Sequence, residues 1–240
     1  MIVNHESQGG DETFGGGLGI YDVTDPAKPR EITKWRTQGR GVHRYDFDGR
    51  YAYISPTAEG YIGNFVMILD LKEPANPEEV GRWLIPGQWQ AGGEESPWEE
   101  WTPPRCHHPI RVGEGPDVSY GHHGFFILDI SDISKPKSVS GFATSPAFPH
   151  PEHTALPIPF PVQGRDLMIL ADEDVAKLRP HPPAFAWVVD ITGEQQPLPI
   201  ATIQPKGQGA MEAHPMTGCH QPSDVVPATE IPFAWLAQRL

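Results

Sequence analysis

One pattern, repeated four times along the chain, constrains the fold more than any other feature of the sequence. Each copy is a short aliphatic segment built around an aspartate, and a proline follows that aspartate by seven residues. A β-branched residue stands ten positions after the aspartate, and a bulky apolar residue stands thirteen positions after it. The aspartates are Asp22, Asp70, Asp129 and Asp190, and the prolines are Pro29, Pro77, Pro136 and Pro197. Four copies at fixed offsets identify an internal repeat.

Each copy predicts a strand, a tight turn and a second strand. Proline cannot donate a hydrogen bond to a β-ladder, so it belongs at the start or the edge of a strand. A further apolar strand is expected upstream, as in Tyr51-Ala52-Tyr53-Ile54 and Leu167-Met168-Ile169-Leu170. The aspartates are 48, 59 and 61 residues apart, and propeller blades are about 40–50 residues long. We therefore predict an all-β chain, a β-propeller of four-stranded antiparallel blades.

The repeat divides the chain into about four and a half predicted blades within one domain, residues 1–240. The blade segments are roughly 1–38, 39–87, 104–146, 150–206 and a partial one at 216–240. The pattern starts in the second strand of a blade and stops before a fifth Asp–Pro unit, which predicts an incomplete ring. Open sheet edges invite pairing. The chain is therefore a fragment with missing blades, a small ring closed by its own ends, or a self-associating protein.

The apolar strand before each aspartate is similar to the repeat that names the LVIVD-repeat proteins. It stands here as Phe126-Ile127-Leu128-Asp129 and Trp187-Val188-Val189-Asp190. The resemblance covers essentially the whole chain and implies a closed propeller longer than this one, so the chain looks truncated at both ends. It implies a fold and no particular activity.

The charge of the chain excludes several classes of partner. The formal net charge is −13, whereas nucleic acids and anionic membranes need a basic face. The apolar runs are strand-sized and the first residues form no secretory signal, so we expect a cytoplasmic protein, an expectation that depends on residue 1 being the native N-terminus. The glycines at Gly15-Gly16-Gly17 precede no helical pattern, so we expect no nucleotide.

Histidines concentrate where the innermost strands of the predicted blades begin. The four best placed are His43, His108, His153 and His220. Innermost strands line the central channel of a propeller, so side chains at their starts are expected to converge on its axis. In the first blade to carry one, His43, Tyr45 and Phe47 alternate along one strand and are expected to share a face. A ring of imidazoles predicts a transition-metal site for Fe, Cu or Zn.

The turns at the same end of the blades carry further polar residues that could orient the imidazoles. The candidates for this role are Glu59, His123 and Glu173, and the segments His5-Glu6 and Asp172-Glu173-Asp174 lie in equivalent turns. The register leaves alternatives open: His107 competes with His108, because Cys106-His107 matches Cys219-His220, and His150 and His214 are further candidates. The competing interpretation is that these histidines only bond backbone carbonyls or line a wet channel.

Two further features bear on function. Cys106 and Cys219 each adjoin a candidate histidine, so they are metal ligands, a disulfide pair or, as we expect, buried inert thiols. The insertion between Leu84 and Pro104 is expected to be either a lid over an apolar pocket or a surface loop. It contains three tryptophans and four glutamates, namely Trp89, Trp98, Trp101, Glu94, Glu95, Glu99 and Glu100.

Three functional hypotheses follow from these residues. The first is a metal-dependent enzyme, an oxidoreductase by class, acting on a small apolar or aromatic molecule at the histidine-bearing face. The second is a non-catalytic propeller that binds a partner or acts as a scaffold. The third is an inactive fragment of a longer protein. No catalytic residue is assigned, because the sequence has no recognisable nucleophile motif.

Overall fold

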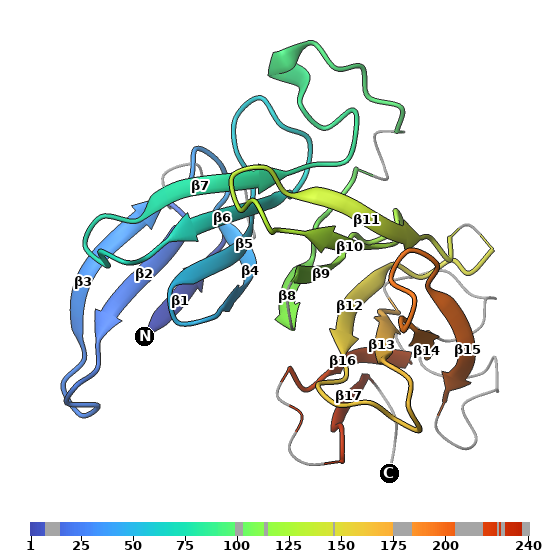
Figure 1. Cartoon of the computed structure of the whole chain (residues 1–240). Coiled ribbons are helices and arrows are strands. Elements are labelled where there is room, and N and C mark those ends of the chain that lie inside the picture. The colour runs from blue at the N-terminus through green and yellow to red at the C-terminus, as the bar shows by residue number, and fades with distance from the viewer. Residues whose placement is uncertain are drawn as a thin grey trace. The chain divides into compact units, whose positions relative to one another are not determined.

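The structure is a computed structural model of the whole chain, in which strands account for almost all regular secondary structure (Figure 1). The residues that it describes are 1–7, 15–98, 103–112, 115–145, 147–174, 184–204, 218–224, 226 and 229–236. Among them, helix is limited to the 3-10 turn η2, Gln90–Gly92. No described helix has the length and apolarity needed to cross a membrane.

Seventeen strands follow one another along the described residues. Their bounds are β1 Ile2–His5, β2 Gly17–Asp22, β3 Arg30–Arg36, β4 Val42–Phe47, β5 Tyr51–Pro56, β6 Val66–Asp70, β7 Glu78–Trp83, β8 His108–Val112, β9 Gly115–Ser119, β10 Phe125–Asp129, β11 Lys137–Phe142, β12 Glu152–Pro157, β13 Leu167–Asp172, β14 Ala186–Asp190, β15 Leu198–Ile203, β16 Gly218–Pro222 and β17 Phe233–Leu236.

The strands form five sheets in which chain neighbours pair, which confirms the all-β, propeller-type prediction. Three sheets have four strands, in the orders β4-β5-β6-β7, β11-β10-β9-β8 and β12-β13-β14-β15. The sheet β1-β2-β3 has three strands and the sheet β16-β17 has two. Every register that is described is antiparallel. This meander of short strands is the blade of a β-propeller.

The chain separates into two compact units. Unit 1 comprises residues 1–111 and 130–137, and unit 2 comprises residues 112–129 and 138–240. The largest core cluster of unit 1 is built on Leu18, Ile54, Phe65 and Leu69. Its counterpart in unit 2 is built on Phe125, Met168, Leu170 and Val189. The prediction of one domain over 1–240 stays a prediction.

The aspartate of the repeat closes the turn that joins the third strand of a blade to the fourth. In three of the four copies its Oδ1 accepts a hydrogen bond from the backbone N–H two residues later. This bond is 2.9 Å at Asp22, 2.8 Å at Asp70 and 3.0 Å at Asp190. Such a turn needs a short acceptor side chain, which aspartate supplies. The repeated aspartates are therefore turn residues, as the sequence indicates.

Candidate functional site

Three of the candidate histidines lie at β-bulges in the first strands of their sheets. Between Glu152 and Thr154, strand β12 advances two residues while its partner β13 advances one, so His153 is the additional residue. His220 is the additional residue of β16 in the same way. Strand β4 has one more residue than β5 in the interval that contains His43. A bulge redirects a side chain out of the regular alternation of the strand.

The bulge in β4 corrects the face that was predicted for His43. The sequence places His43 on a common face with Tyr45 and Phe47 by simple alternation, but the register of β4 shifts between Val42 and Tyr45. A sequence without an alignment carries no signal for a single extra residue in a strand. The histidines were recognisable from their position at strand starts, and their local geometry was not.

The clearest cluster of potential metal ligands lies in unit 2. One ligand atom each from His153, Glu173 and His220 lie within 4.8 Å of one another. Nε2 of His220 is 3.5 Å from Oε1 of Glu173, and the centroids of the two imidazole rings are 4.5 Å apart. Glu173 follows β13 directly, so it comes from the turn between the second and third strands, where a carboxylate was predicted beside the histidines.

The surroundings of His153 hold its ring in place. His153 is 2% exposed, and its Nδ1 lies 2.7 Å from the hydroxyl of Thr154. The hydroxyl of Ser119 donates to the backbone carbonyl of His153 at 2.6 Å. His220 and Glu173 are only half-buried. The cluster therefore has one buried, hydrogen-bonded member and two members that solvent reaches.

Two fully buried carboxyl groups stand beside this cluster. Glu152 and Asp172 lie directly opposite each other on β12 and β13 and are 0% and 1% exposed. Burial raises the pKa of Glu152, and burial together with the charge of Glu152 raises the pKa of Asp172 well above its usual range. Oε1 of Glu152 accepts from the backbone N–H of Thr144 at 2.7 Å, and Oδ2 of Asp172 accepts from the indole N–H of Trp187 at 3.0 Å. Sequence reasoning did not single out Glu152.

A second histidine cluster lies in unit 1. Nδ1–H of His43 donates to Oε2 of Glu6 at 2.6 Å, and Nε2 of His43 is 2.8 Å from Nε2 of His107. Nη2 of Arg105 lies 3.0 Å and 3.2 Å from the two ring nitrogens of His43. Burial alone would raise the pKa of Glu6, but the hydrogen bond and charge of His43 and the charges of Arg105 and Arg40 hold it below its usual value.

The structure separates the two histidines that competed in register. His107 lies beside His43, with ring centroids 4.5 Å apart. His108 is 3% exposed, and its Nε2 is 3.3 Å from the backbone carbonyl of Tyr45. Because His43 and His108 belong to unit 1 and the other two candidates belong to unit 2, the axial site of four histidines stays a prediction.

The remaining residues that the sequence singled out lie as follows. Glu59 has an exposed side chain, and its backbone N–H donates to Gln38 at 3.1 Å. His123 is half-buried. His150 is buried, with Nδ1 3.9 Å from Oδ1 of Asp174. His214 lies outside the described residues.

Both cysteines are free and buried. Burial raises the pKa of the Cys106 thiol well above its usual value. Burial and the charge of Asp172 raise the pKa of Cys219 to about 12. Free, buried and protonated thiols agree with the inert-thiol interpretation, and the disulfide alternative stays untested.

The tryptophan-rich insertion is described only as far as residue 98 and from residue 103. Trp89 is 44% exposed and stacks on Tyr61 with ring centroids 6.5 Å apart. Oε2 of Glu94 accepts from the backbone N–H groups of Gly87 at 2.7 Å and Trp89 at 3.1 Å. Glu99, Glu100 and Trp101 lie outside the described residues. The lid stays a prediction.

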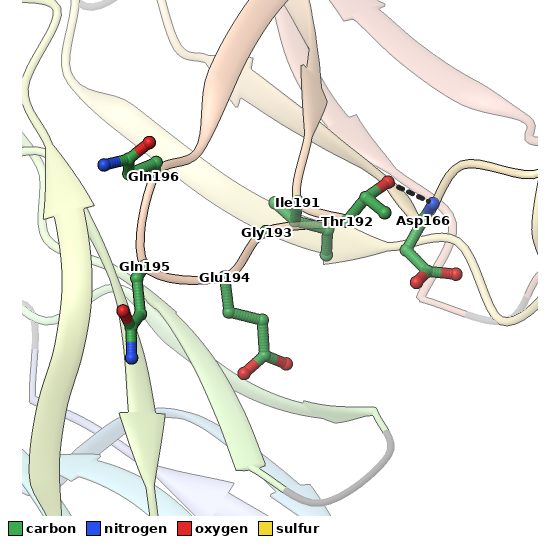
Figure 2. A pocket seen from close by; sticks show the side chains of 7 residues that line it. All are labelled: Asp166, Ile191, Thr192, Gly193, Glu194, Gln195 and Gln196. Atoms are coloured by element: carbon green, nitrogen blue, oxygen red, sulfur yellow. Dashed lines mark hydrogen bonds between the residues drawn. The ribbon is translucent and has the colours of Figure 1, made fainter.

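Unit 2 also carries an open pocket at the turn between β14 and β15. It has a volume of about 740 Å³ and is lined by residues 191–196 and Asp166. Figure 2 shows the hydroxyl of Thr192 accepting the 3.0 Å hydrogen bond from the backbone N–H of Asp166. The side chain of Glu194 extends from the same turn (Figure 2). No histidine lines this pocket, so it is distinct from the predicted histidine-bearing face.

The chain was also compared with protein-family models. Residues 118–144 match the LVIVD repeat. This segment runs from the end of β9 to just past β11 and contains the aspartate and proline of the third copy of the internal repeat. A search of curated proteins finds no match.

Proposed function

We propose that this chain, in which residues 118–144 match the LVIVD repeat, binds a divalent transition metal through His153, Glu173 and His220 in unit 2. The observation that carries the proposal is the convergence of three ligand atoms within 4.8 Å. Two imidazoles and one carboxylate are a donor set that suits Zn²⁺ and Fe²⁺, and such three-ligand sites leave positions for water or a small molecule.

The dimensions of the cluster support this proposal. Ligands at about 2.0–2.2 Å from a common ion are separated from one another by about 3 Å, and Glu173 and His220 already stand at 3.5 Å. Thr154 beside Nδ1 of His153 acts as the outer partner that orients a ligating imidazole, so Nε2 becomes the ligand atom. The net charge of −13 favours a cation.

The cluster of unit 1 is a poorer metal site. The guanidinium of Arg105 lies within 3.2 Å of both ring nitrogens of His43, and a second cation there would be repelled. We therefore assign Glu6, His43 and His107 the role of an ion-paired cluster, and the metal to unit 2.

The chemistry that follows is that of an ion with an open coordination position. A bound Zn²⁺ or Fe²⁺ acts as a Lewis acid on water or on a small ligand. Glu173 and His220, being half-buried, admit that ligand from solvent. The apolar or aromatic substrate predicted from the tryptophan-rich insertion remains an expectation.

The test is metal analysis of tag-free protein, as isolated and after reconstitution with Fe²⁺, Zn²⁺ or Cu²⁺. We expect one ion per chain, lost in Glu173→Gln and in His220→Ala. The controls are Glu194→Gln, an exposed carboxylate of unit 2, and His122→Ala, a half-buried histidine outside the cluster. Circular dichroism shows whether each variant folds. A folded wild-type chain that takes up no metal would favour the non-catalytic binding module.

A further inference from the structure

The Asp–Pro turn of one sheet packs on the outer strand of the sheet that precedes it. In unit 1, a Cβ atom added to Gly81 of β7 would lie 2.0 Å from the carbonyl oxygen of Ile133, in the turn before β11. In unit 2, the hydroxyl of Ser140 on β11 donates to the backbone carbonyl of Glu194, in the turn before β15. Gly81 and Ser140 are both eleven residues after the repeat aspartate, and Ile133 and Glu194 are both four residues after it.

The residue directly after the aspartate supplies the apolar part of this contact. Leu71, Ile130 and Ile191 hold this position, and they are 6%, 8% and 9% exposed. Ile130 clusters with Ile68 and Val80 of the preceding sheet. Ile191 clusters with Ile127 and Val139 in the same way. The contact is therefore a repeated device, a knob from one turn in a socket formed by the outer two strands of the previous sheet.

One knob residue, Val23, and one socket residue, Ala201, are more exposed than the residues at the equivalent positions of the other repeats. At the knob position, Val23 of the first turn is half-buried, whereas the other three residues are buried. At the socket position, Ala201 of β15 is exposed, whereas Gly81 is buried and Thr33 and Ser140 are half-buried.

Strand β15 extends this exposed socket. All six of its residues are exposed, including Leu198 at 59% and Ile203 at 36%, whereas Ile200 at 42% is exposed to the same degree as its equivalent Ile32 in β3 at 40%. The outer strands β7 and β11 each contain residues that are at least half-buried. A strand edge with exposed apolar side chains is a surface for association.

We infer that the chain associates with itself head to tail, the turn of residues 22–29 of one copy docking on β15 of the next. The internal contacts name the occupant, because the same turn type covers the equivalent surface within the chain. Residue Val23 then takes the place of Leu71, Ile130 and Ile191, and Ala201 takes the place of Gly81 and Ser140. A contact between two different surfaces is heterologous, and it leaves one free surface at each end of the assembly.

The strand register at the socket of β15 matches the register at the equivalent sites of β3 and β7. In β3, β7 and β15 the residue ten positions after the aspartate is an extra residue of a bulge, and the next residue pairs with the one two positions before the aspartate. Ala201 is paired with Val188 as Gly81 is paired with Ile68. The socket of β15 thus has the same register as an occupied one.

The test is sedimentation analysis of the chain of 26.5 kDa from about 1 to about 200 µM, a range that detects micromolar association. About 0.3 M salt screens the repulsion between copies that each carry a charge of −13. We expect the mean mass to rise with concentration. Ala201→Glu in the socket and Val23→Asp in the knob should each weaken association at least about tenfold.

Mixing two variants tests whether the contact is head to tail. A Val23→Asp copy retains an intact socket and an Ala201→Glu copy retains an intact knob, so mixing the two should give pairs and nothing larger. Thr202→Glu, on the same strand and exposed, should associate like the wild type. Val23→Ala replaces Val23→Asp if the charged variant does not fold. A wild type that stays monomeric, association that both variants leave unchanged, or equal loss in Thr202→Glu would each overturn the inference.

Discussion

At the level of single residues, the aspartate of the repeat combines a turn with an ion pair. Asp22 pairs with Arg30 at 2.9 Å, Asp70 with Arg50 at 2.6 Å and Asp190 with Arg165 at 2.9 Å. The turn role was readable from the sequence because one residue type recurs at one offset. The arginine partners were not readable, because their distance along the chain differs from copy to copy.

We predict that Asp22 makes the stability of the chain depend on pH at acid values. Hydrogen bonds from the side chain and backbone of Thr24, and the ion pair with Arg30, lower the pKa of Asp22 from 3.8 to about 2. A carboxyl group whose pKa is lower in the folded state than in the unfolded state stabilises the folded state. For Asp22 this stabilisation is fully present above the unfolded-state pKa of 3.8, and it is lost as the pH falls through the folded-state pKa of about 2. The melting temperature of the Asp22→Asn variant should therefore be lower than that of the wild type at neutral pH, and the two should approach each other near pH 2. The control is Asp25→Asn in the same turn. A difference in melting temperature between Asp22→Asn and the wild type that persists unchanged at pH 2 would contradict the explanation.

The cysteines give a second prediction at this scale. Cys106 and Cys219 are 0% exposed, and the raised pKa of each thiol keeps it protonated at pH 8. The thiolate is the reactive form. A disulfide reagent should therefore label neither thiol in the folded chain and both after denaturation. Rapid labelling of either thiol under native conditions would show that its surroundings open to solvent.

At the level of elements, the turn between β10 and β11 packs closely against β7 because Gly81 has no side chain. We predict that Gly81→Ala lowers the free energy of unfolding by about 1–3 kcal/mol, because its Cβ atom would meet the Ile133 carbonyl oxygen, 2.0 Å away. Urea denaturation measures the effect. Gly193→Ala is the control, since a Cβ atom there meets nothing within 4 Å. Equal stabilities of the two variants would mean that the turn moves away at little cost.

The elements also show where sequence reasoning ends. Strands β6, β10 and β14 and the turns that follow them were predictable, because the Asp–Pro repeat fixes their positions. The extra residues of β4, β12 and β16 were not, since a bulge depends on the pairing of two strands and leaves no mark in either one alone. For the same reason, the sequence could not decide whether His107 or His108 lies beside His43.

At the level of the whole molecule, the repeat predicted the blade architecture and the approximate position of each sheet. The division into two compact units was not predicted, because a repeat describes each blade by its own residues and says little about which neighbours share a core. The sequence predicted a site of histidines and carboxylates at one end of the blades, and that site stays a prediction. The grouping of Glu173 with His153 and His220 in unit 2, on which the proposed metal site rests, required the structure.

The placement of His153 and His220 on extra residues has a consequence for how such a protein changes over time. An extra residue has no partner in the strand register, so replacing it leaves the pairs on either side in place, and in the proposed site the scaffold and the ligands are then encoded by different positions. The same sheet can then be given a new ligand set by altering one position per strand. If the proposed metal site is demonstrated, an engineer could use this separation to exchange its ligands on one unchanged frame.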